Sequence, residues 1–409
     1  MQQTDRRNAE NLADVIPGAT PRSLQRFVTA APWDDAAVID RLQAVIAPLL
    51  AAPDAVFVLD DTGFPKQGAH SVGVARQDSG TLGKVGNCQV GVVLAYASSR
   101  GQALVDRSLF LPERWSDDRE RCRAAGVPDD VRHATKPTLG LALLAAARRR
   151  GALTSAWVTG DAGYGEIPTF RAALDTDGWL FVLEVPSTTR VFAQPAQAAV
   201  PAWSGRGRRP TRPRLVPGEP SAMTVAAVAA TASDWEPLTV AEGAQGPRRY
   251  HFWRQRVWEC QDGVPGVERW LLLRQNLDGS ELKYALSNAP VETPLQTIAQ
   301  VQAFRWPVET GFQQYKGETG LAEYEVRSWR GWHHHTALAL VAGAFLLQLQ
   351  QDWGGKGGRA DDTAGESRVA GAAAPADVDG RGPPVLARGD PARQRAGAPS
   401  ACPPTRTAA

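Results

Sequence analysis

Cysteine is scarce in this chain, and its placement excludes two kinds of architecture. The four cysteines, Cys88, Cys122, Cys260 and Cys402, lie far apart, and no CxxC pair occurs. Zinc clusters need closely spaced ligands and small secreted folds need matched cysteines, so the sequence argues against both. A reducing cytoplasm is the compartment that fits such a chain.

Long apolar runs are absent as well. The first residues, MQQTDRRNAENLADV, contain no apolar signal core. The most apolar run, from Ala337 to Leu349, is too short to span a bilayer. We therefore expect a cytoplasmic protein that does not enter a membrane.

Lysine is rare, and acidic residues are missing from one long stretch. Net charge is only +2, so the overall charge does not by itself indicate a nucleic-acid partner. However, residues 186–217 contain six arginines and no acidic residue. Such a stretch would neutralise several phosphates of DNA, and its alternative interpretation is a solvated loop. Five of its arginines fall within SGRGRRPTRPRLV: Arg206, Arg208, Arg209, Arg212 and Arg214.

Core-forming residues disappear after Trp353. Residues 354–409 contain no aromatic residue, no isoleucine and one leucine, Leu386. Such a segment cannot bury enough apolar area to offset its ordering entropy, so we predict that the tail 353–409 is disordered. The tail also looks like a GC-rich coding region read out of frame. That hypothesis fails if neither alternative frame of the gene encodes a helical continuation with Leu and Trp.

The rest of the chain, 43% hydrophobic overall, can bury a sizeable core. Residues 1–53 are predicted to be helical, with Thr20 as an N-cap before Pro21 and a second helix from near Trp33. This N-terminal helical segment is either a small DNA-binding bundle or a helical cap over the core.

Residues 54–186 show a recognisable order of elements. AVFVLDDT reads as a buried strand that ends in two carboxylates, and a glycine-rich stretch and two more strands follow it. A helix over residues 138–149, a strand that ends at Asp161, a short helix and the strand WLFVLEVP complete the set. Three strands, helix, strand, helix, strand is the order of an RNase H-like fold. The segment is therefore predicted to be the first part of that core.

Residues 187–290 contain the basic loop and a β-leaning region, and residues 291–352 are predicted to be helical. Pro307 lacks an amide proton, so a helix that reaches it should kink or restart there. The predicted fold class is thus α/β: an RNase H-like mixed sheet flanked by helices, with a β-rich insertion before the C-terminal helices of the core.

Three acidic residues stand where such a core could hold metal ions. Transesterification of DNA needs an attacking and a leaving oxygen stabilised across one phosphorus, which two divalent ions roughly 3.5–4 Å apart can provide. Asp60 and Asp161 follow strands and Glu309 lies one turn into a helix, so together they could hold two Mg²⁺ ions, for which Mn²⁺ could substitute. Taken singly, an aspartate at the end of a strand is more commonly a turn former or helix cap than a metal ligand. Glu309 could instead be a solvated residue or pair with Arg305 or Lys316.

At this point three blocks resemble bacterial insertion-sequence transposases of the DDE superfamily. The stretch from LDDTGFPKQG to VLAYAS resembles the first-aspartate block, VTGDAGYGEIPTFRAAL the second, and FRWPVETGFQQYKGETG the glutamate block. The resemblance covers roughly residues 15–350. It implies binding of terminal inverted repeats and target DNA, a homodimer in the DNA complex, and a bacterial, nucleoid-associated protein.

The same group carries a signature of Tyr, Arg, Glu and Lys around the catalytic glutamate. Arg305, Glu309 and Lys316 match its last three places, while Gln302 occupies the tyrosine place. The resemblance implies that Arg305 and Lys316 hold phosphates near the DNA end and that Trp306 stacks on a displaced base. For Trp306 the alternative is a core position.

Two further choices concern the first block. Family members read Asp, any residue, then Thr or Ser, which favours Asp60 over Asp61 as the metal ligand, with Asp61 kept as the alternative. Lys66 and Lys84 are candidates for DNA contact, and the hairpin around Lys84 is either DNA-facing or a packing element.

The predicted function is metal-dependent cleavage at insertion-sequence ends followed by strand transfer into target DNA. A catalytically defective relic that recognises inverted repeats without transposing is the alternative. A carboxylate-pair hydrolase acting on sugars is disfavoured, because it would leave Arg305, Lys316 and the arginine-rich stretch unexplained.

Overall fold

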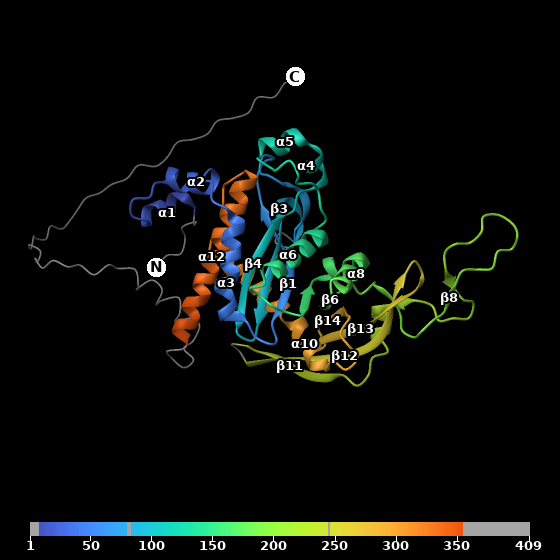
Figure 1. Ribbon diagram of the computed structural model, residues 1–409. Helices are drawn as coiled ribbons and strands as arrows, with labels where there is room; N and C mark the ends of the chain where they lie inside the picture. Colours follow the sequence, from blue (N-terminus) through green and yellow to red (C-terminus); the bar gives the residue numbers. More distant parts are fainter. Residues whose placement is uncertain (1–7, 80–82, 244–245, 355–409) are drawn as a thin grey trace, which may run out of the picture. The chain divides into compact units, whose positions relative to one another are not determined.

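The computed structural model describes residues 8–79, 83–243 and 246–354. Its main feature is one 12-stranded mixed sheet with helices packed against it (Figure 1). All but the first two residues of the predicted disordered tail lie outside the described residues. In the described part of the chain, no helix is long and apolar enough to cross a membrane.

Five strands form the RNase H-like core that the sequence predicts. Their order across the sheet is β4-β3-β1-β5-β6; β1 runs antiparallel to β3 and parallel to β5, and β5 runs parallel to β6. Strand β2 (Ala75–Ser79) adds to β3 and makes the glycine-rich stretch an extended hairpin. The core strands are β1 (Val56–Pro65), β3 (Lys84–Ser98), β4 (Gly101–Leu109), β5 (Trp157–Gly160) and β6 (Leu180–Glu184).

The insertion extends this sheet. Strand β14 pairs antiparallel with β6, so the strands of the insertion continue the core sheet beyond its edge. The sequence predicted a β-rich insertion but not this pairing. The strands concerned are β7 (Arg190–Phe192), β10 (Met223–Thr224), β11 (Glu236–Gly243), β12 (Gly246–Gln261), β13 (Val264–Asn276) and β14 (Leu282–Ser287); β8 (Ala198–Ala199) and β9 (Arg214–Leu215) pair separately.

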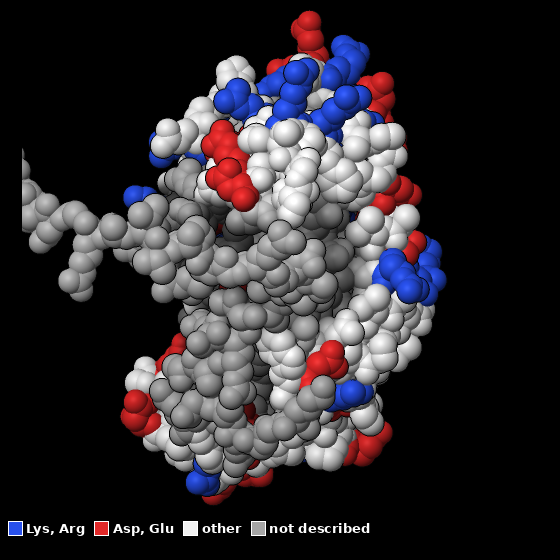
Figure 2. Space-filling model, turned by 90° about the vertical axis from the view of Figure 1, so that its left-hand side faces the viewer, with Lys and Arg blue, Asp and Glu red and all other residues white. Residues whose placement is uncertain are grey.

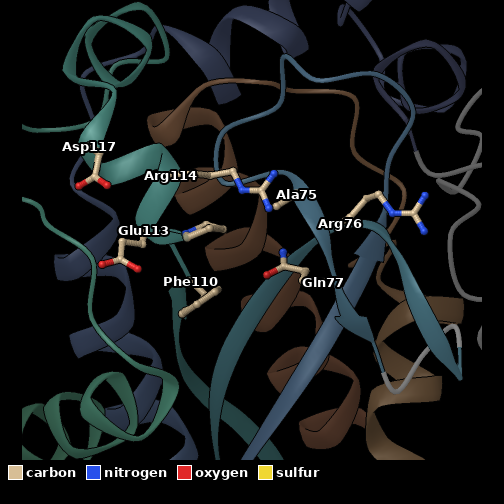
Figure 3. A pocket seen from close by; sticks show the side chains of 8 residues that line it. Ala75, Arg76, Gln77, Phe110, Glu113, Arg114 and Asp117 are labelled. Atoms are coloured by element: carbon tan, nitrogen blue, oxygen red, sulfur yellow. The ribbon is translucent and has the colours of Figure 1, made fainter.

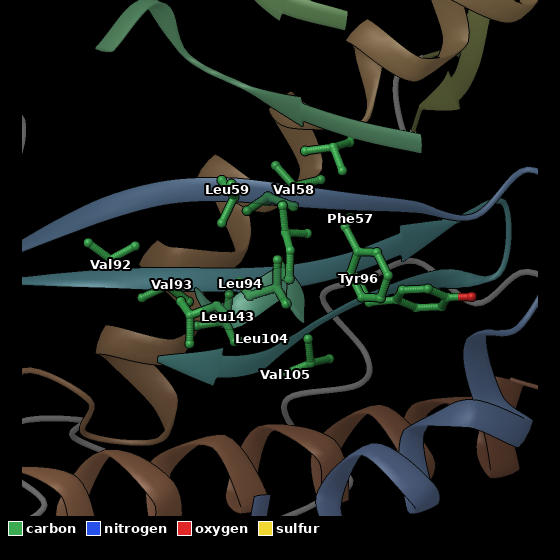
Figure 4. Packing of buried hydrophobic residues seen from close by; sticks show 14 of the residues in the cluster. Phe57, Val58, Leu59, Val92, Val93, Leu94, Tyr96, Leu104, Val105 and Leu143 are labelled. Atoms are coloured by element: carbon green, nitrogen blue, oxygen red, sulfur yellow. The ribbon is translucent and has the colours of Figure 1, made fainter. Parts of the chain in front are cut away.

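Helices cover both faces of the core sheet. Helix α6 lies against Leu59 of β1 through Gly140, whereas α12 brings Trp332 against Phe64 of the same strand. Because alternate strand residues point to opposite faces, α6 and α12 lie on opposite sides of β1. The aliphatic and aromatic core between β1, β3, β4 and α6 is shown in Figure 4.

The helix ends follow the sequence where a cap is present. Thr20 caps α2 in a capping box with Ser23, and Asp34 caps α3, close to the predicted starts. Four short helices, α4, α5, α7 and α9, were not predicted. The helices are α1 (Ala9–Val15), α2 (Pro21–Thr29), α3 (Asp35–Leu50), α4 (Glu113–Asp117), α5 (Arg119–Ala124), α6 (Lys136–Arg150), α7 (Ala162–Gly165), α8 (Pro168–Thr176), α9 (Val225–Ala229), α10 (Leu295–Ala303), α11 (Arg305–Glu318) and α12 (Trp329–Gly354).

A buried charge network joins the insertion to the core. Glu259 of β12 accepts from Arg171 of α8 at 2.5 Å and from Arg269 of β13 at 2.7 Å. Arg269 also pairs with Asp175 of α8. The side chains of Arg171, Glu259 and Arg269 are each at most 5% exposed. The network therefore fixes the insertion to α8 by charges that cannot be left unpaired.

Candidate active site

Three carboxylates stand in one row across the core sheet. Leu59 of β1 is aligned with Gly160 of β5, and Gly160 is aligned with Leu183 of β6. The residue after each of these is acidic: Asp60, Asp161 and Glu184. Since the three strands are parallel and in register, the row lies at one level near the carboxyl ends of β5 and β6.

The row differs from the prediction in two respects. Strand β1 does not end at Asp60, because Thr62 to Pro65 continue its pairing with β3, so Asp60 lies in the middle of a strand. Glu184 was not singled out from the sequence, where it is one residue of an apolar strand. Gly165 shows how closely α7 lies on this strand, because a Cβ there would come within 1.8 Å of the Glu184 carbonyl oxygen.

Asp60 faces a strongly charged environment. Burial raises its pKa; Arg305 lowers it and Asp161 raises it, and the balance is a pKa of about 7. The backbone N–H of Asp61 donates to Asp60 Oδ1 at 2.7 Å. Asp161 is the N-cap of α7, and its Oδ1 accepts from the backbone N–H of Tyr164 at 3.3 Å. The two predicted aspartates are therefore close enough for the charge of one to act on the other.

Arg305, the first residue of α11, lies among all the acidic groups. Its Nη1 is 2.5 Å from Glu184 Oε2, and its Nη2 donates to Glu309 Oε1 at 2.8 Å. Burial lowers the pKa of Arg305, but the charges of Glu184, Asp60, Glu309 and Asp161 raise it above its ordinary value. One guanidinium thus contacts two carboxylates and interacts with the charge of two more.

Asp61 lies on the other face of β1. Its Oδ1 accepts from the Tyr164 hydroxyl at 2.6 Å, and its Oδ2 is 2.8 Å from Lys136 Nζ at the start of α6. Burial and the charge of Asp61 raise the pKa of Tyr164 well above 10, so the phenol remains a donor. Of the two adjacent aspartates, Asp60 is thus the one directed toward Arg305 and Asp161, while Asp61 joins β1 to α6 and α7.

The acidic side chains of this cluster suit a hard divalent cation, because carboxylate oxygens are the ligands that Mg²⁺ and Mn²⁺ prefer. As the side chains stand, however, the described residues contain no group of three His, Cys, Asp or Glu that could hold a metal ion. The Glu309 carboxylate is paired with Arg305 at 2.8 Å. The carboxylates of Asp60 and Asp161, which act on each other's charge, are nevertheless of the type that such a cation prefers.

A comparison with protein families decides the relationship. A family model described as DDE superfamily endonuclease matches residues 1–247, well over half of the chain. The chain belongs to this family. The match includes Asp60 and Asp161 and ends before Glu309. A search of curated proteins gives no match.

In this member of the DDE superfamily endonuclease family, α11 presents two different faces. Val308, Phe312 and Tyr315 are buried, as the helical spacing predicts. The Glu309 side chain is 52% exposed. Burial lowers the pKa of Lys316, and the charge of Asp60 opposes that shift, which indicates that Lys316 also lies near the carboxylates.

Trp306 is not a core residue. It is 43% exposed, and the guanidinium carbon of Arg248 lies 2.9 Å from the centre of its ring. Arg248 belongs to β12, so the insertion reaches the first turn of the helix that carries Glu309. Arg248 was not identified from the sequence, because nothing local separates it from the neighbouring arginines of that strand.

The other predicted DNA contacts lie outside this cluster of charges. Lys66 Nζ donates to the Tyr324 carbonyl oxygen at 2.9 Å and lies 3.4 Å from the centre of the Tyr324 ring, so its charge is used within the fold. Lys84 is exposed at the start of β3. The five arginines of the basic stretch are exposed on and beside the loop between β8 and β9: Arg206, Arg208, Arg209, Arg212 and Arg214.

A separate pocket of about 480 Å³ lies between β2 and α4. Arg76, Gln77, Phe110 and Arg114 line it, together with two acidic residues of α4. Figure 3 shows Arg114 reaching from α4 toward β2, whereas the carboxylates of α4 point the other way. The pocket thus offers a basic and an amide group that were not singled out from the sequence.

Tyr164 connects the two aspartate strands, which leads to a stability prediction. Tyr164→Phe removes the donor to the charged Asp61 and should lower the free energy of unfolding by about 1–3 kcal/mol, measured by urea denaturation. Tyr96→Phe is the matched control, because the Tyr96 hydroxyl donates to a neutral carbonyl oxygen, that of Thr154, at 2.8 Å. We expect the smaller loss for the control, about 0.5–1.5 kcal/mol. Equal losses of unfolding free energy in Tyr164→Phe and Tyr96→Phe would show that the hydrogen bond to Asp61 is no stronger than one to a neutral carbonyl oxygen.

Proposed function

We propose that this DDE endonuclease is a DNA transposase that cleaves at the ends of an insertion sequence and transfers the strand into target DNA. The observation that carries the proposal is the placement of Asp60 on β1 and of Asp161 directly after the adjacent parallel strand β5. Arg305 of α11 acts on the charge of both aspartates and is paired with Glu309. Membership of the DDE superfamily endonuclease family supports a nuclease activity.

The proposed cofactor is a pair of Mg²⁺ ions, for which Mn²⁺ can substitute. Asp60 and Asp161 would hold them, with Glu309 as the third ligand after it leaves Arg305. When bound, such ions activate the attacking oxygen and stabilise the leaving oxygen of an in-line displacement. The protein's own contribution is to fix both aspartates: the N–H of Asp61 orients Asp60, and the N–H of Tyr164 orients Asp161.

The surroundings of this site suit a DNA backbone. Lys316 and Arg305 provide positive charge on the face of β1 that carries Asp60, and exposed Trp306 offers an aromatic surface for an unpaired base. In this proposal Arg248 supports the Trp306 ring from the insertion.

Basic groups also occur farther from the carboxylates. Figure 2 shows Lys and Arg side chains gathered at the top of the face it draws, the end at which Figure 1 shows α4 and α5. These helices carry Arg114, Arg119, Arg121 and Arg123. We propose that DNA beyond the cleavage site runs toward this end of the molecule.

The proposed partners are the terminal inverted repeats and a target DNA, bound by a homodimer in the nucleoid of a bacterium. Lys84 and the exposed arginines of the β8–β9 region are further proposed contacts to phosphates. The N-terminal segment 1–53, the core 54–186 with 291–352, and the insertion 187–290 would then act as one unit on the DNA.

A catalytically defective relic is the second candidate. Gln302 replaces the tyrosine of the signature, and neither polar atom of its buried side chain makes a hydrogen bond. A relic would bind repeat ends without nicking them.

A cleavage assay separates these candidates. A labelled repeat end is incubated with Mg²⁺ and either the unchanged protein or Asp161→Ala. Metal-dependent nicking that the substitution abolishes supports the transposase. Binding of the end without nicking supports the relic.

The basic stretch makes a prediction about salt. Replacing its five arginines by glutamine should make the fall of DNA affinity with salt less steep, by about 0.9 in the log–log slope for each phosphate that the variant no longer neutralises. The matched control is Arg149→Gln, an exposed arginine in the last turn of α6. Fluorescence anisotropy at several salt concentrations measures the slope, and a slope equal to that of the control would show that the loop does not touch DNA.

A further inference from the structure

The starting point is the competition for carboxylates around Arg305. Its guanidinium contacts Glu184 and Glu309 directly, and Asp60 and Asp161 act on its charge. Its Nε is buried and makes no hydrogen bond. The same acidic groups are those that the proposed function assigns to divalent ions, so the guanidinium and the ions need the same partners.

The two contacts of Arg305 differ in how easily they can be broken. The side chains of Arg305 and Glu184 are 11% and 12% exposed, so this pair lies in a buried setting where separating the charges is costly. Glu309 is 52% exposed and lies one turn from Arg305 on the same helix, so this contact is that of a surface pair. Glu309 can therefore leave Arg305 far more readily than Glu184 can.

Glu184 also stands at the opposite end of the row from Asp60, beyond Asp161, so it draws Arg305 away from Asp60. Strand β5 separates β6 from β1, and neighbouring strands are about 4.8 Å apart, so the backbones at Glu184 and Asp60 are roughly 10 Å apart. Without Glu184, the guanidinium of Arg305 would remain among the carboxylates of Asp60, Asp161 and Glu309. Because like charges repel strongly in a buried setting, it would then oppose the entry of cations.

We propose that Arg305 occupies the carboxylate cluster in place of divalent cations, and that Glu184 is the positioning residue that retains Arg305 when Glu309 transfers to the cations. This inference rests on the proposed function, because it takes Asp60, Asp161 and Glu309 as the cation ligands. Glu184 acts through Arg305 and is not itself a ligand.

The test is calorimetric titration of Mn²⁺ into the full chain without DNA. Arg305→Gln removes the competing charge and should bind Mn²⁺ about tenfold or more tightly than the unchanged protein. Glu184→Gln leaves Arg305 among the other carboxylates and should bind Mn²⁺ about tenfold or more weakly. The double variant should bind like Arg305→Gln, because Glu184 has nothing left to position.

Each other result has a defined meaning. Unchanged or weaker Mn²⁺ binding in Arg305→Gln overturns the proposal that Arg305 and the cations exchange at the carboxylates. If adding Glu184→Gln to Arg305→Gln weakens Mn²⁺ binding further, Glu184 is itself a ligand, and its positioning role is overturned. Arg305→Lys retains a positive charge and should bind no more tightly than the unchanged protein; tightening in this variant would also overturn the exchange.

An Asp161→Asn variant distinguishes the exchange from the proposed function. Mn²⁺ binding that Asp161→Asn leaves intact contradicts the proposed function. Binding that is lost in Asp161→Asn but is unchanged in Arg305→Gln contradicts only the exchange. If neither the unchanged protein nor Arg305→Gln binds Mn²⁺, both fail. Thermal unfolding of every variant confirms that the compared proteins are folded.

Discussion

Asp60→Asn is expected to abolish strand cleavage and, in the metal-free protein at pH 8, to raise the free energy of unfolding. The loss of cleavage follows from the removal of a charged ligand at the reacting phosphate and should be at least about 10²–10³-fold. The gain in stability follows from the environment of Asp60, which burial and the charge of Asp161 make unfavourable for an ionised carboxylate despite Arg305.

The direction of the pH effect is set by the raised pKa. In the folded protein the pKa of Asp60 is about 7, against an ordinary value of 3.8, so the folded state binds the proton more tightly. The stabilisation is fully present below about pH 4 and is lost as pH rises to 7 and above. The ceiling on the loss is about 4 kcal/mol, since one pKa unit corresponds to about 1.4 kcal/mol.

Urea denaturation at pH 4 and pH 8 with a chelator present measures this effect. In Asp60→Asn, the free energy of unfolding should differ less between pH 4 and pH 8 than it does in the unchanged protein. Asp61→Asn is the matched control on the opposite face of β1, where it weakens the pair with Lys136 and should stabilise nothing. If Asp60→Asn destabilises the metal-free protein at pH 8, the charged Asp60 stabilises the fold, which would contradict its proposed role as a cation ligand.

Glu259→Gln should be the most destabilising single change among the charged residues. It leaves the buried Arg171 without its carboxylate partner, while Arg269 keeps only Asp175, and an uncompensated buried charge typically costs about 3–5 kcal/mol. Burial raises the pKa of Glu259, but the hydrogen bonds and charges of Arg171 and Arg269 lower it below 4.5 overall. Its contribution is therefore present above about pH 4.5 and is lost as pH falls below that value.

The control for Glu259 is Glu268→Gln. Glu268 pairs with Arg256 at 3.0 Å on the same two strands, but its side chain is 42% exposed. A surface pair of this kind contributes at most about 1 kcal/mol. Similar losses of unfolding free energy in the two variants would contradict the view that a buried network joins the insertion to α8.

The core was predictable because its elements have local signals. Apolar strands that run up to acidic residues, the Thr20 cap and the break before Pro307 each depend on a few neighbouring residues, and the structure has all of them, although β1 continues past Asp60 to Pro65. The lack of large side chains in α9 and the short lengths of α4, α5 and α7 explain why these helices were missed.

What depended on pairing between distant strands could not be predicted. The role of Glu184 appears only when β6 is aligned with β5, and the extension of the sheet appears only when β14 is paired with β6. Lys66 looked like a DNA contact because its Tyr324 partner is far along the chain. Strand alternation predicted that Asp60 and Asp61 point to opposite faces of β1. Only the positions of α6 and α11 show that Asp60 is on the face of Arg305.

The most direct test of the proposed cation site is the anomalous difference density of Mn²⁺ in crystals of the protein with a repeat-end DNA. We expect density bounded by Asp60 and Asp161, with the Glu309 carboxylate turned from Arg305 to join them. Density elsewhere, or none at these residues while Glu309 stays paired with Arg305, would contradict this site.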